Sequence, residues 1–243
     1  MADVQRAGVE HTARRLTLAI DVGGTGLKAS VVDEAAQMLT ERVRVPTPVG
    51  APPQQIVETL VNLVTPLAPF DRVSVGFPGV VREGRVLTAP NLGNDQWQGF
   101  ELARALDMAL GKPVRLANDA DLQGLAVIAG KGVEMVITLG TGFGTGLYLD
   151  GRLGPHLEIS HHPFRHGETY DEQLGNAARK AIGVARWNKR VKKAIGTLRR
   201  LTNFDHLYVG GGNAKKIDFT LDPDVTVVSN DAGMKGGVAL WRY

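Results

Sequence analysis

Residues Leu18–Lys28 read LAIDVGGTGLK and place an acid, three glycines, a threonine and a lysine between two apolar runs. Such a stretch has two interpretations. It is either a tight hairpin turn, in which glycine supplies positive φ angles, or a loop whose backbone N–H groups approach phosphate oxygens. A turn alone gives no reason for Asp21 and Lys28 at its ends. A phosphate site does, because the carboxylate can hold Mg²⁺ through water and the lysine can offset phosphate charge.

Two further glycine clusters follow strand-like runs in the second half of the chain. Residues 134–151 read EMVITLGTGFGTGLYLDG, a strand, a glycine loop and a strand, with threonine hydroxyls beside the glycines. The cluster Gly210–Asn213 lies between an apolar run and an expected helix start, where anions and nucleotides bind favourably. Neither common nucleotide fingerprint, G-x-x-x-x-G-K-[ST] or G-x-G-x-x-G, fits these loops. Three such loops at strand ends still indicate nucleotide or polyphosphate binding.

The order of apolar runs predicts an α/β chain made of two similar halves. Alternation predicts strands and helical spacing predicts helices, with strands in 16–20, 27–32, 38–45, 72–79, 113–119, 134–151, 206–209 and 225–229 and helices in 54–67, 100–110, 119–130, 171–185, 185–201 and 230–241. Each half opens with strand, glycine loop and strand, which suggests a duplicated fold with a cleft between the halves. We expect a flexible N-terminal tail, two α/β domains and a closing helix, at 1–15, 16–117, 118–229 and 230–243.

Composition excludes several classes of protein. Hydrophobic residues make up 43% and charged residues 22% of the 243 residues, as is typical of globular proteins. A net charge of +3 is too small to indicate nucleic-acid binding. The absence of cysteine excludes disulfides and thiolate metal sites. Because the sequence has no 18-residue apolar run or signal-peptide pattern, we expect a cytoplasmic protein with no membrane partner.

Six motifs in combination resemble those of the ROK family of sugar kinases, and among its members the short polyphosphate/ATP-dependent glucokinases. They are D-x-G-G-T-x-x-K at 21–28, FPGVV at 77–81, NDAD at 118–121, TLGTGFGTGLYLDG at 138–151, VGGGNAKK at 209–216 and NDAGMKGG at 230–237. The resemblance implies an actin-like ATPase (ribonuclease H-like) duplicated fold. Two α/β domains would surround a central cleft, and the C-terminal helix would pack back on the N-terminal domain.

The resemblance also implies an activity. The chain would be a Mg²⁺-dependent kinase that moves a terminal phosphoryl group from polyphosphate, ATP or both to the 6-hydroxyl of glucose or a related hexose. The family implies a homodimer. Mannose, fructose or an N-acetylhexosamine as acceptor remains an alternative, as does a non-catalytic sugar sensor on the same scaffold. The presence of both Asp119 and Lys28 argues against a sensor, which needs no catalytic base.

Asp119 is the predicted catalytic base. It ends an expected strand in LANDAD, and its carboxylate would take the proton of the attacking sugar hydroxyl. The alternative is a helix cap, since Asn118 or Asp119 before ADLQGLA would cap a helix well. Both roles can coexist. Phosphate and metal would be handled by Asp21, Gly23, Gly24, Thr25, Lys28, Gly140, Thr141 and Gly142, and the donor end by Gly211, Gly212 and Asn213, with Mg²⁺ held through water by Asp21.

Carboxylates, amides and imidazoles that bind sugar hydroxyls form the predicted acceptor site. The resemblance assigns it Asn91, Asn118, Glu158, His161 and a second carboxylate, for which we choose Glu172 over Asp171. Ser160 stands where the family motif E-x-G-H has glycine, which leaves the sugar preference open. We expect His162 and His166 on the surface. We expect no zinc, because the zinc site of the family needs cysteines.

Residues 185–201 read ARWNKRVKKAIGTLRRL. Trp187, Val191, Ala194, Ile195, Leu198 and Leu201 would share one helical face, and seven arginines and lysines would occupy the others. The plain interpretation is a solvated helix that packs through its apolar stripe. The sharper interpretation is a basic track for polyphosphate, whose binding would weaken with salt.

Overall fold

The computed structural model describes residues 15–67, 69–229 and 233–242. The predicted tail therefore lies outside the described residues except for Arg15, as do residues 230–232 and 243 of the predicted closing segment. Within the described part of the chain, no helix is long and apolar enough to cross a membrane.

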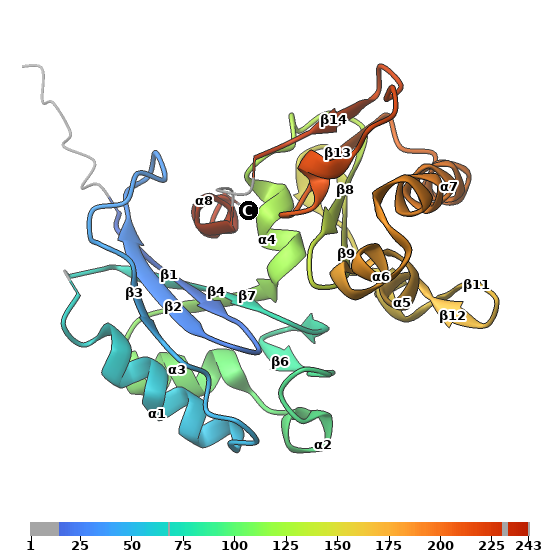
Figure 1. Cartoon of the computed structure of the whole chain (residues 1–243). Helices are drawn as coiled ribbons and strands as arrows, with labels where there is room; N and C mark the ends of the chain where they lie inside the picture. The colour runs from blue at the N-terminus through green and yellow to red at the C-terminus, as the bar shows by residue number, and fades with distance from the viewer. Residues whose placement is uncertain (1–14, 68, 230–232, 243) are drawn as a thin grey trace, which may run out of the picture.

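The first half of the chain forms a five-stranded sheet in the order β3-β2-β1-β4-β7. Its strands are β1 (Thr17–Val22), β2 (Leu27–Val32), β3 (Val43–Val45), β4 (Arg72–Phe77) and β7 (Val114–Asn118). β1 is antiparallel to β2 and parallel to β4, and β4 is parallel to β7. The helices α1 (Pro53–Val64) and α3 (Leu102–Leu110) cover one face of this sheet (Figure 1).

The second half repeats this arrangement. Its sheet has the order β10-β9-β8-β13-β14 and is built from β8 (Val133–Leu139), β9 (Phe143–Leu149), β10 (Arg152–Leu153), β13 (His206–Gly210) and β14 (Val225–Val227). β8 pairs antiparallel with β9 and parallel with β13, which is parallel to β14. Each sheet thus consists of three antiparallel strands, one of them shared with a parallel set of three, and the predicted duplicated α/β fold is confirmed.

The helix α4 (Asp119–Leu125) connects the halves and packs between the two sheets (Figure 1). Its Leu122 lies against Gly76 of β4, where an added Cβ would come within 3.2 Å of Cδ1 of the leucine. Leu122 also packs with Val136 and Tyr148 of the second sheet. Residues alternate between the faces of a strand, so Met135 and Ile137 point the other way, into the core under α7 (Val184–Thr202).

The closing helix α8 (Gly233–Ala239) packs against α4 and the first sheet. At Gly236 an added Cβ would lie 1.6 Å from the carbonyl oxygen of Leu122, so only glycine lets the two helices approach this closely. The hydroxyl of Ser74 in β4 donates to the carbonyl of Gly237 at 2.6 Å, and Trp241 Nε1 donates to the same hydroxyl at 2.8 Å.

The remaining elements are short and lie in the connections. They are β5 (Val81–Arg82), β6 (Arg85–Val86), α2 (Asn94–Trp97), the 3₁₀ turns η1 (Ile159–His161) and η2 (Ala214–Lys216), the hairpin of β11 (Pro163–Arg165) and β12 (Glu168–Thr169), and the helices α5 (Tyr170–Leu174) and α6 (Asn176–Ile182).

Glycine breaks the helix that the sequence predicts over 171–185. At Gly175 an added Cβ would lie 2.6 Å from the carbonyl oxygen of Thr141, and the extended backbone there separates α5 from α6. Gly183 has a φ of 80° and separates α6 from α7. One predicted helix is therefore two.

Three other expectations about single elements are wrong. Leu201 is 64% exposed instead of sharing the apolar face of α7, because Thr202, one turn after the buried Leu198, faces Met135. The helix predicted to Gly130 ends at Leu125, and the N–H groups of residues 129–131 donate to the carboxylate of Glu134 instead of continuing it. After the third glycine cluster only the single turn η2 forms.

Candidate functional site

The turn from β7 into α4 places Asp119 at the edge of the first sheet. Asn118 caps the helix, because its Oδ1 accepts the N–H groups of Ala120 at 2.8 Å and Asp121 at 3.4 Å. Its Nδ2 donates to the carbonyl of Gly79 at 3.0 Å. The structure thus assigns the cap to Asn118, whose carboxamide is held by the protein, while its predicted contact with sugar stays a prediction.

Asp119 has the electrostatic surroundings of a proton acceptor. Burial raises the pKa of its carboxyl to about 6, although the N–H of Ala120 donates to Oδ1 and opposes the rise. The charges of Asp21, Asp121 and Glu158 raise it further. A carboxylate of this kind is still largely ionised at neutral pH, yet it is a stronger base than an ordinary aspartate.

The first glycine loop closes the β1–β2 hairpin at the same edge. Asp21 and Lys28 are directly opposite in the ladder, and Nζ of the lysine donates to Oδ2 of the aspartate at 2.9 Å. The hydroxyl of Thr47 donates to the carbonyl of Gly23 at 2.5 Å and fixes the turn from outside. Gly24 and Thr25, the predicted phosphate contacts at its tip, are exposed.

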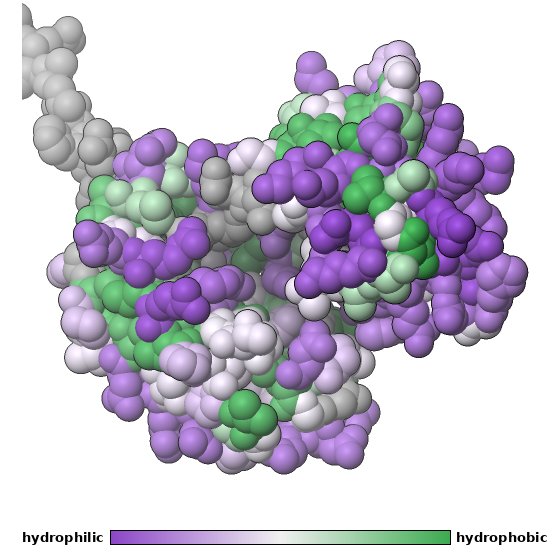
Figure 2. Space-filling view, viewed as in Figure 1, coloured by the Kyte–Doolittle hydropathy of each residue, from purple (hydrophilic) through white to green (hydrophobic). Residues whose placement is uncertain are grey.

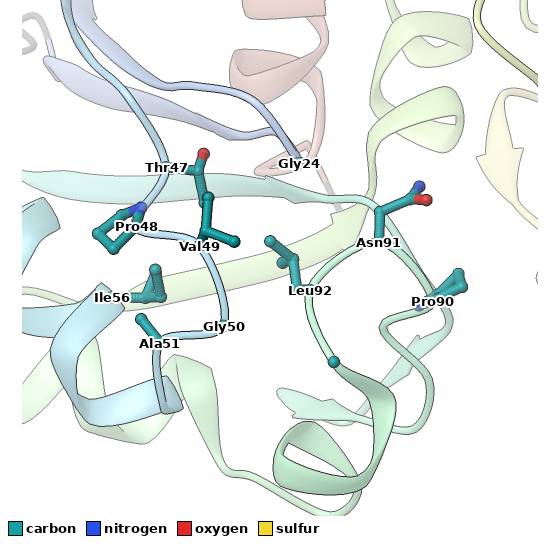
Figure 3. Close-up of a pocket in the computed structure, with 11 residues that line it drawn as sticks. Gly24, Thr47, Pro48, Val49, Gly50, Ala51, Ile56, Pro90, Asn91 and Leu92 are labelled. Atoms are coloured by element: carbon teal, nitrogen blue, oxygen red, sulfur yellow. The ribbon is translucent and has the colours of Figure 1, made fainter.

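A pocket of about 180 Å³ lies beside this loop. Figure 3 shows it between the segment 47–51 and the segment 90–93, with Gly24 at its edge. Asn91, a predicted sugar contact, stands at this edge, since a Cβ added at Gly24 would come within 3.2 Å of the asparagine Cβ. The structure therefore brings Asn91 next to the first glycine loop.

The second and third glycine loops lie side by side. The carboxamide of Asn213 donates to the carbonyl of Gly140 at 3.0 Å, and its backbone N–H donates to that of Leu139 at 2.8 Å. Asp171 accepts the N–H of Phe143 at 2.5 Å, just behind Thr141 and Gly142. Side chains from two distant segments thus hold these loops together.

Two of the glycines in these loops face open space. An added Cβ at Gly140 or Gly212 would meet nothing within 4 Å, whereas one at Gly211 would lie 2.4 Å from the carbonyl oxygen of Leu139. The fold therefore requires glycine at Gly211, which also has a φ of 87°, but not at the other two. No contact within the described part of the protein explains glycine at these two positions. Close approach of a ligand to the backbone would explain it.

Three of the predicted acceptor residues, Glu158, His161 and Glu172, lie shortly before, in or shortly after η1. Glu158 precedes the turn and His161 ends it. Hydrogen bonds from Thr169 keep the pKa of Glu172 below its usual value. Glu172 is exposed and forms a capping box with Thr169 at the start of α5. The hydroxyl of Ser160 donates to Oε1 of Glu158, so the serine that replaces glycine in E-x-G-H contacts the predicted sugar carboxylate. His162 and His166 are exposed, as expected.

Sequence reasoning did not use His156. Its Nδ1 lies 2.9 Å from Oδ2 of Asp121, and its Nε2 lies 3.3 Å from Oε2 of Glu158. Asp121 lies inside the predicted helix, which makes it a less suitable base than Asp119, and the structure buries it. In the sequence, only the spacing H-x-E at 156–158 could have indicated a contact of His156 with Glu158. Its other partner, Asp121 on α4, is 35 residues away.

The first loop fits Mg²⁺. This ion keeps several waters and binds through one or two carboxylates together with substrate phosphates. The side chain of Asp21 is 42% exposed beside the glycine loop, and its Oδ1 has no hydrogen-bond partner among the residues that the structure describes. Asp21 can therefore hold a hydrated ion without losing its contact with Lys28.

Known proteins resemble this chain in sequence and in fold. The model of the ROK family matches residues 17–168. The polyphosphate glucokinase of Mycobacterium tuberculosis (strain CDC 1551 / Oshkosh) is 31% identical over 217 residues, which are 85% of this chain and 81% of the relative.

Two solved structures extend the comparison. The inorganic polyphosphate/ATP-glucomannokinase of Arthrobacter sp. strain KM superposes with a TM-score of 0.80 at 31% identity and covers 92% of this chain and 97% of its own. A ROK family glucokinase from Streptomyces griseus, in complex with glucose and AMPPNP, has a TM-score of 0.71 at 21% identity, with 93% and 97% covered. At that identity the second structure supports the fold alone.

Proposed function

The chain belongs to the ROK family, and on that premise we propose that it is a polyphosphate/ATP-dependent glucokinase. It transfers a terminal phosphoryl group from polyphosphate, ATP or both to the 6-hydroxyl of glucose or a related hexose. The relatives that act on polyphosphate and glucose, at 31% identity over most of the chain, support this assignment.

One observation of the structure carries the proposal. Asp119, with its pKa raised to about 6, lies at the edge of the first sheet where the first glycine loop also lies. Phosphoryl transfer needs little covalent chemistry from the protein beyond positioning, charge neutralisation and a base for the attacking hydroxyl. The site offers one residue or loop for each of these tasks.

Asp119 acts as the base. The sugar O6 attacks the terminal phosphorus while the carboxylate takes the proton of the hydroxyl. The bond between that phosphorus and its bridging oxygen breaks, and the shortened polyphosphate or ADP leaves with the bonding electrons. Asn118 keeps Asp119 in place by capping α4.

The donor is held by the three glycine loops. Backbone N–H groups at Gly23, Gly24 and Thr25 and at the turn 140–142 bind phosphate oxygens, and Lys28 offsets their charge. The cluster Gly211–Asn213 receives the far end of the donor. Asp21 would hold Mg²⁺ through water, and the bound ion would supply neutralisation of the phosphate charge.

The acceptor sugar lies between Asn91 and η1. Glu158, His161 and Glu172 bind its hydroxyls, with Asn118 at the side of Asp119. Asp171 holds the second glycine loop instead, and this supports Glu172 as the second sugar carboxylate.

The basic side of α7 is a candidate track for the polyphosphate chain. Arg186, Lys189, Lys192, Lys193 and Arg200 are exposed, and Figure 2 shows hydrophilic residues over the side of the molecule where α7 lies. Arg190 and Arg199 have partners within the protein, namely the carbonyl of Gln173 and the pair Asp222 and Asp224. Lys192 and Lys193 lie over the rings of Phe219 and Phe164, at 5.8 and 5.4 Å from the ring centroids, which leaves their charges without a counter-ion among the described residues. The five exposed cations can therefore attract a polyanion, and their effect would weaken with salt.

The test is formation of hexose 6-phosphate by purified protein with glucose, Mg²⁺ and either ATP or long-chain polyphosphate, over a salt series. We expect turnover with polyphosphate that falls steeply with salt. Turnover with ATP alone keeps the kinase and leaves α7 as a solvated helix. A sugar panel follows if glucose is inert, and no product with any hexose favours the sensor. A homodimer and a cytoplasmic location remain predictions.

A further inference from the structure

A chain of polar side chains runs from α4 to η1. The ring of His156 lies between Asp121 and Glu158, at 2.9 Å from Oδ2 of the first and 3.3 Å from Oε2 of the second. The hydroxyl of Ser160 donates to the other carboxylate oxygen of Glu158. The side chains of Asp121 and His156 are 2% and 9% exposed, and that of Glu158 is 32% exposed. The chain thus begins in the core and ends at the predicted sugar site.

The ring carries a positive charge in this arrangement. Both of its nitrogens face carboxylate oxygens, and only the imidazolium can donate from both. Although burial disfavours the charged ring, the hydrogen bonds to Asp121 and Glu158 raise the pKa of His156 to about 10. Burial likewise opposes ionisation of Glu158, but the donors His156 and Ser160 keep its pKa below the usual value.

The neighbours of the ring connect both parts of the proposed site. Asp121 is two residues after Asp119 on α4, and Glu158 is a predicted sugar carboxylate. The charges that act on Asp119 are those of Asp21, Asp121 and Glu158. Glu158 in turn is influenced by His156 and His161. The imidazolium therefore lies between two of the anions that oppose ionisation of the proposed base.

We propose that His156 is a positioning residue of the acceptor site, which holds Oε2 of Glu158 against α4 while Ser160 holds Oε1. This inference rests on the proposed function. It also gives the departure from E-x-G-H a role, because a glycine at Ser160 could not hold the second oxygen. Fixing both oxygens leaves the carboxylate one orientation toward the sugar, which lowers the entropy lost on binding.

Two consequences separate positioning from a purely structural role. Loss of the cation frees Glu158, so the KM for glucose rises while the KM for the donor does not. Burial raises the pKa of Asp121, so the charge that loses its compensation near Asp119 is that of Glu158, and the base holds its proton to higher pH. The fall of kcat on the acid side of its pH profile (the acid limb) then occurs at a higher pH.

The experiment compares His156→Gln with His206→Gln, which alters a histidine that contacts Thr226 at 2.9 Å, away from the site. For His156→Gln we expect a rise in the KM for glucose of roughly tenfold, as for a lost hydrogen bond to a charged group. The donor KM should stay within about twofold and the acid limb should shift upward. His206→Gln should match the unaltered protein in all three.

Ser160→Gly is a second variant. It keeps the buried ion pair of His156 with Asp121, so it is less liable to unfold than His156→Gln. It should raise the KM for glucose less than His156→Gln and leave the acid limb in place. Melting temperatures of all variants show whether each is folded. If both folded variants keep the glucose KM and the acid limb of the unaltered protein, the inference is overturned while the kinase assignment stands. If the unaltered protein phosphorylates no hexose, the proposed function fails and takes the inference with it.

Discussion

The two glycine hairpins have the same pattern in sequence but are held in different ways. In β1–β2, the pair Asp21 and Lys28 closes the ladder from within the hairpin, and Thr47, 24 residues after Gly23, fixes the turn. In β8–β9, the turn is held by Asp171, 28 residues after Phe143, and by Asn213, 73 residues after Gly140. The first loop is therefore held partly by its own hairpin, whereas the second depends on side chains from outside it.

Asp119 lies outside both hairpins. Removing its charge should have the largest effect on catalysis. Asp119→Asn should lower kcat by about a thousandfold, the range of a lost general base, with glucose binding by calorimetry unchanged. In the unaltered protein kcat should fall below about pH 6, where the carboxylate gains its proton. Substantial turnover by the variant would refute the assignment.

The same substitution should also affect the stability of the fold, in a direction that follows from the raised pKa. Folding raises the pKa of Asp119, so the folded protein binds this proton more tightly than the unfolded chain, and stability from this group is lost as the pH rises through about 6. Asp119→Asn removes that cost and should keep or raise the melting temperature at neutral pH. A clear fall would mean that the carboxylate is needed for the fold.

The third glycine cluster allows a matched pair of substitutions. Gly211→Ala should lower the free energy of unfolding by about 3 kcal/mol or more, since it combines a left-handed φ with a backbone clash. Gly212→Ala should stay within about 0.5 kcal/mol, because the space there is open, but should raise the KM for the donor. Urea unfolding and donor titrations test both, and equal stabilities would contradict the close approach of Gly211 to Leu139.

Because Asp171 holds the second hairpin, we expect substitutions of the neighbouring acids Asp171 and Glu172 to affect different KM values. Asp171→Ala leaves the N–H of Phe143 without its acceptor and should raise the donor KM roughly tenfold, with little effect on the glucose KM. Glu172→Gln should do the reverse. If Asp171→Ala raised the glucose KM instead, Asp171 would be the second sugar carboxylate.

Removing the ion pair within the first hairpin should have the smallest effect on stability. The ion pair of Lys28 with Asp21 is well exposed, and such pairs contribute at most about 1 kcal/mol. Lys28→Met should therefore change the melting temperature little while weakening donor binding at low salt. Loss of this difference between low and high salt would argue against a phosphate contact by Lys28.

How much could be predicted from sequence follows the same division. The strands, the duplicated order and the position of Asp119 at a strand end depend on local patterns, and the sequence contains them. The broken helix after Asp171 could not be foreseen, because Gly175 is fixed by the distant Thr141. Leu201 fitted the helical period, but which residue of the last turn faces the sheet depends on how α7 packs.

The site shows the same limit. Motifs pointed to Glu158 and His161, but not to the ring between Asp121 and Glu158, since that contact joins α4 to a loop beyond the second hairpin. The choice between Asp171 and Glu172 had no local signal either. The reason to propose Glu172 is the contact of Asp171 with the backbone of Phe143, which joins residues 28 apart in the chain.

The packing of α8 has a consequence for synthesis. Domains generally fold as the chain leaves the ribosome, the N-terminal part first, yet the neighbour that α4 acquires at Gly236 belongs to α8, the last of the described helices along the chain. A nascent chain that ends at β14 has both sheets but lacks the glycine surface behind the helix of Asp119. The first sheet can therefore form before α8 is available to pack behind the helix that begins at Asp119.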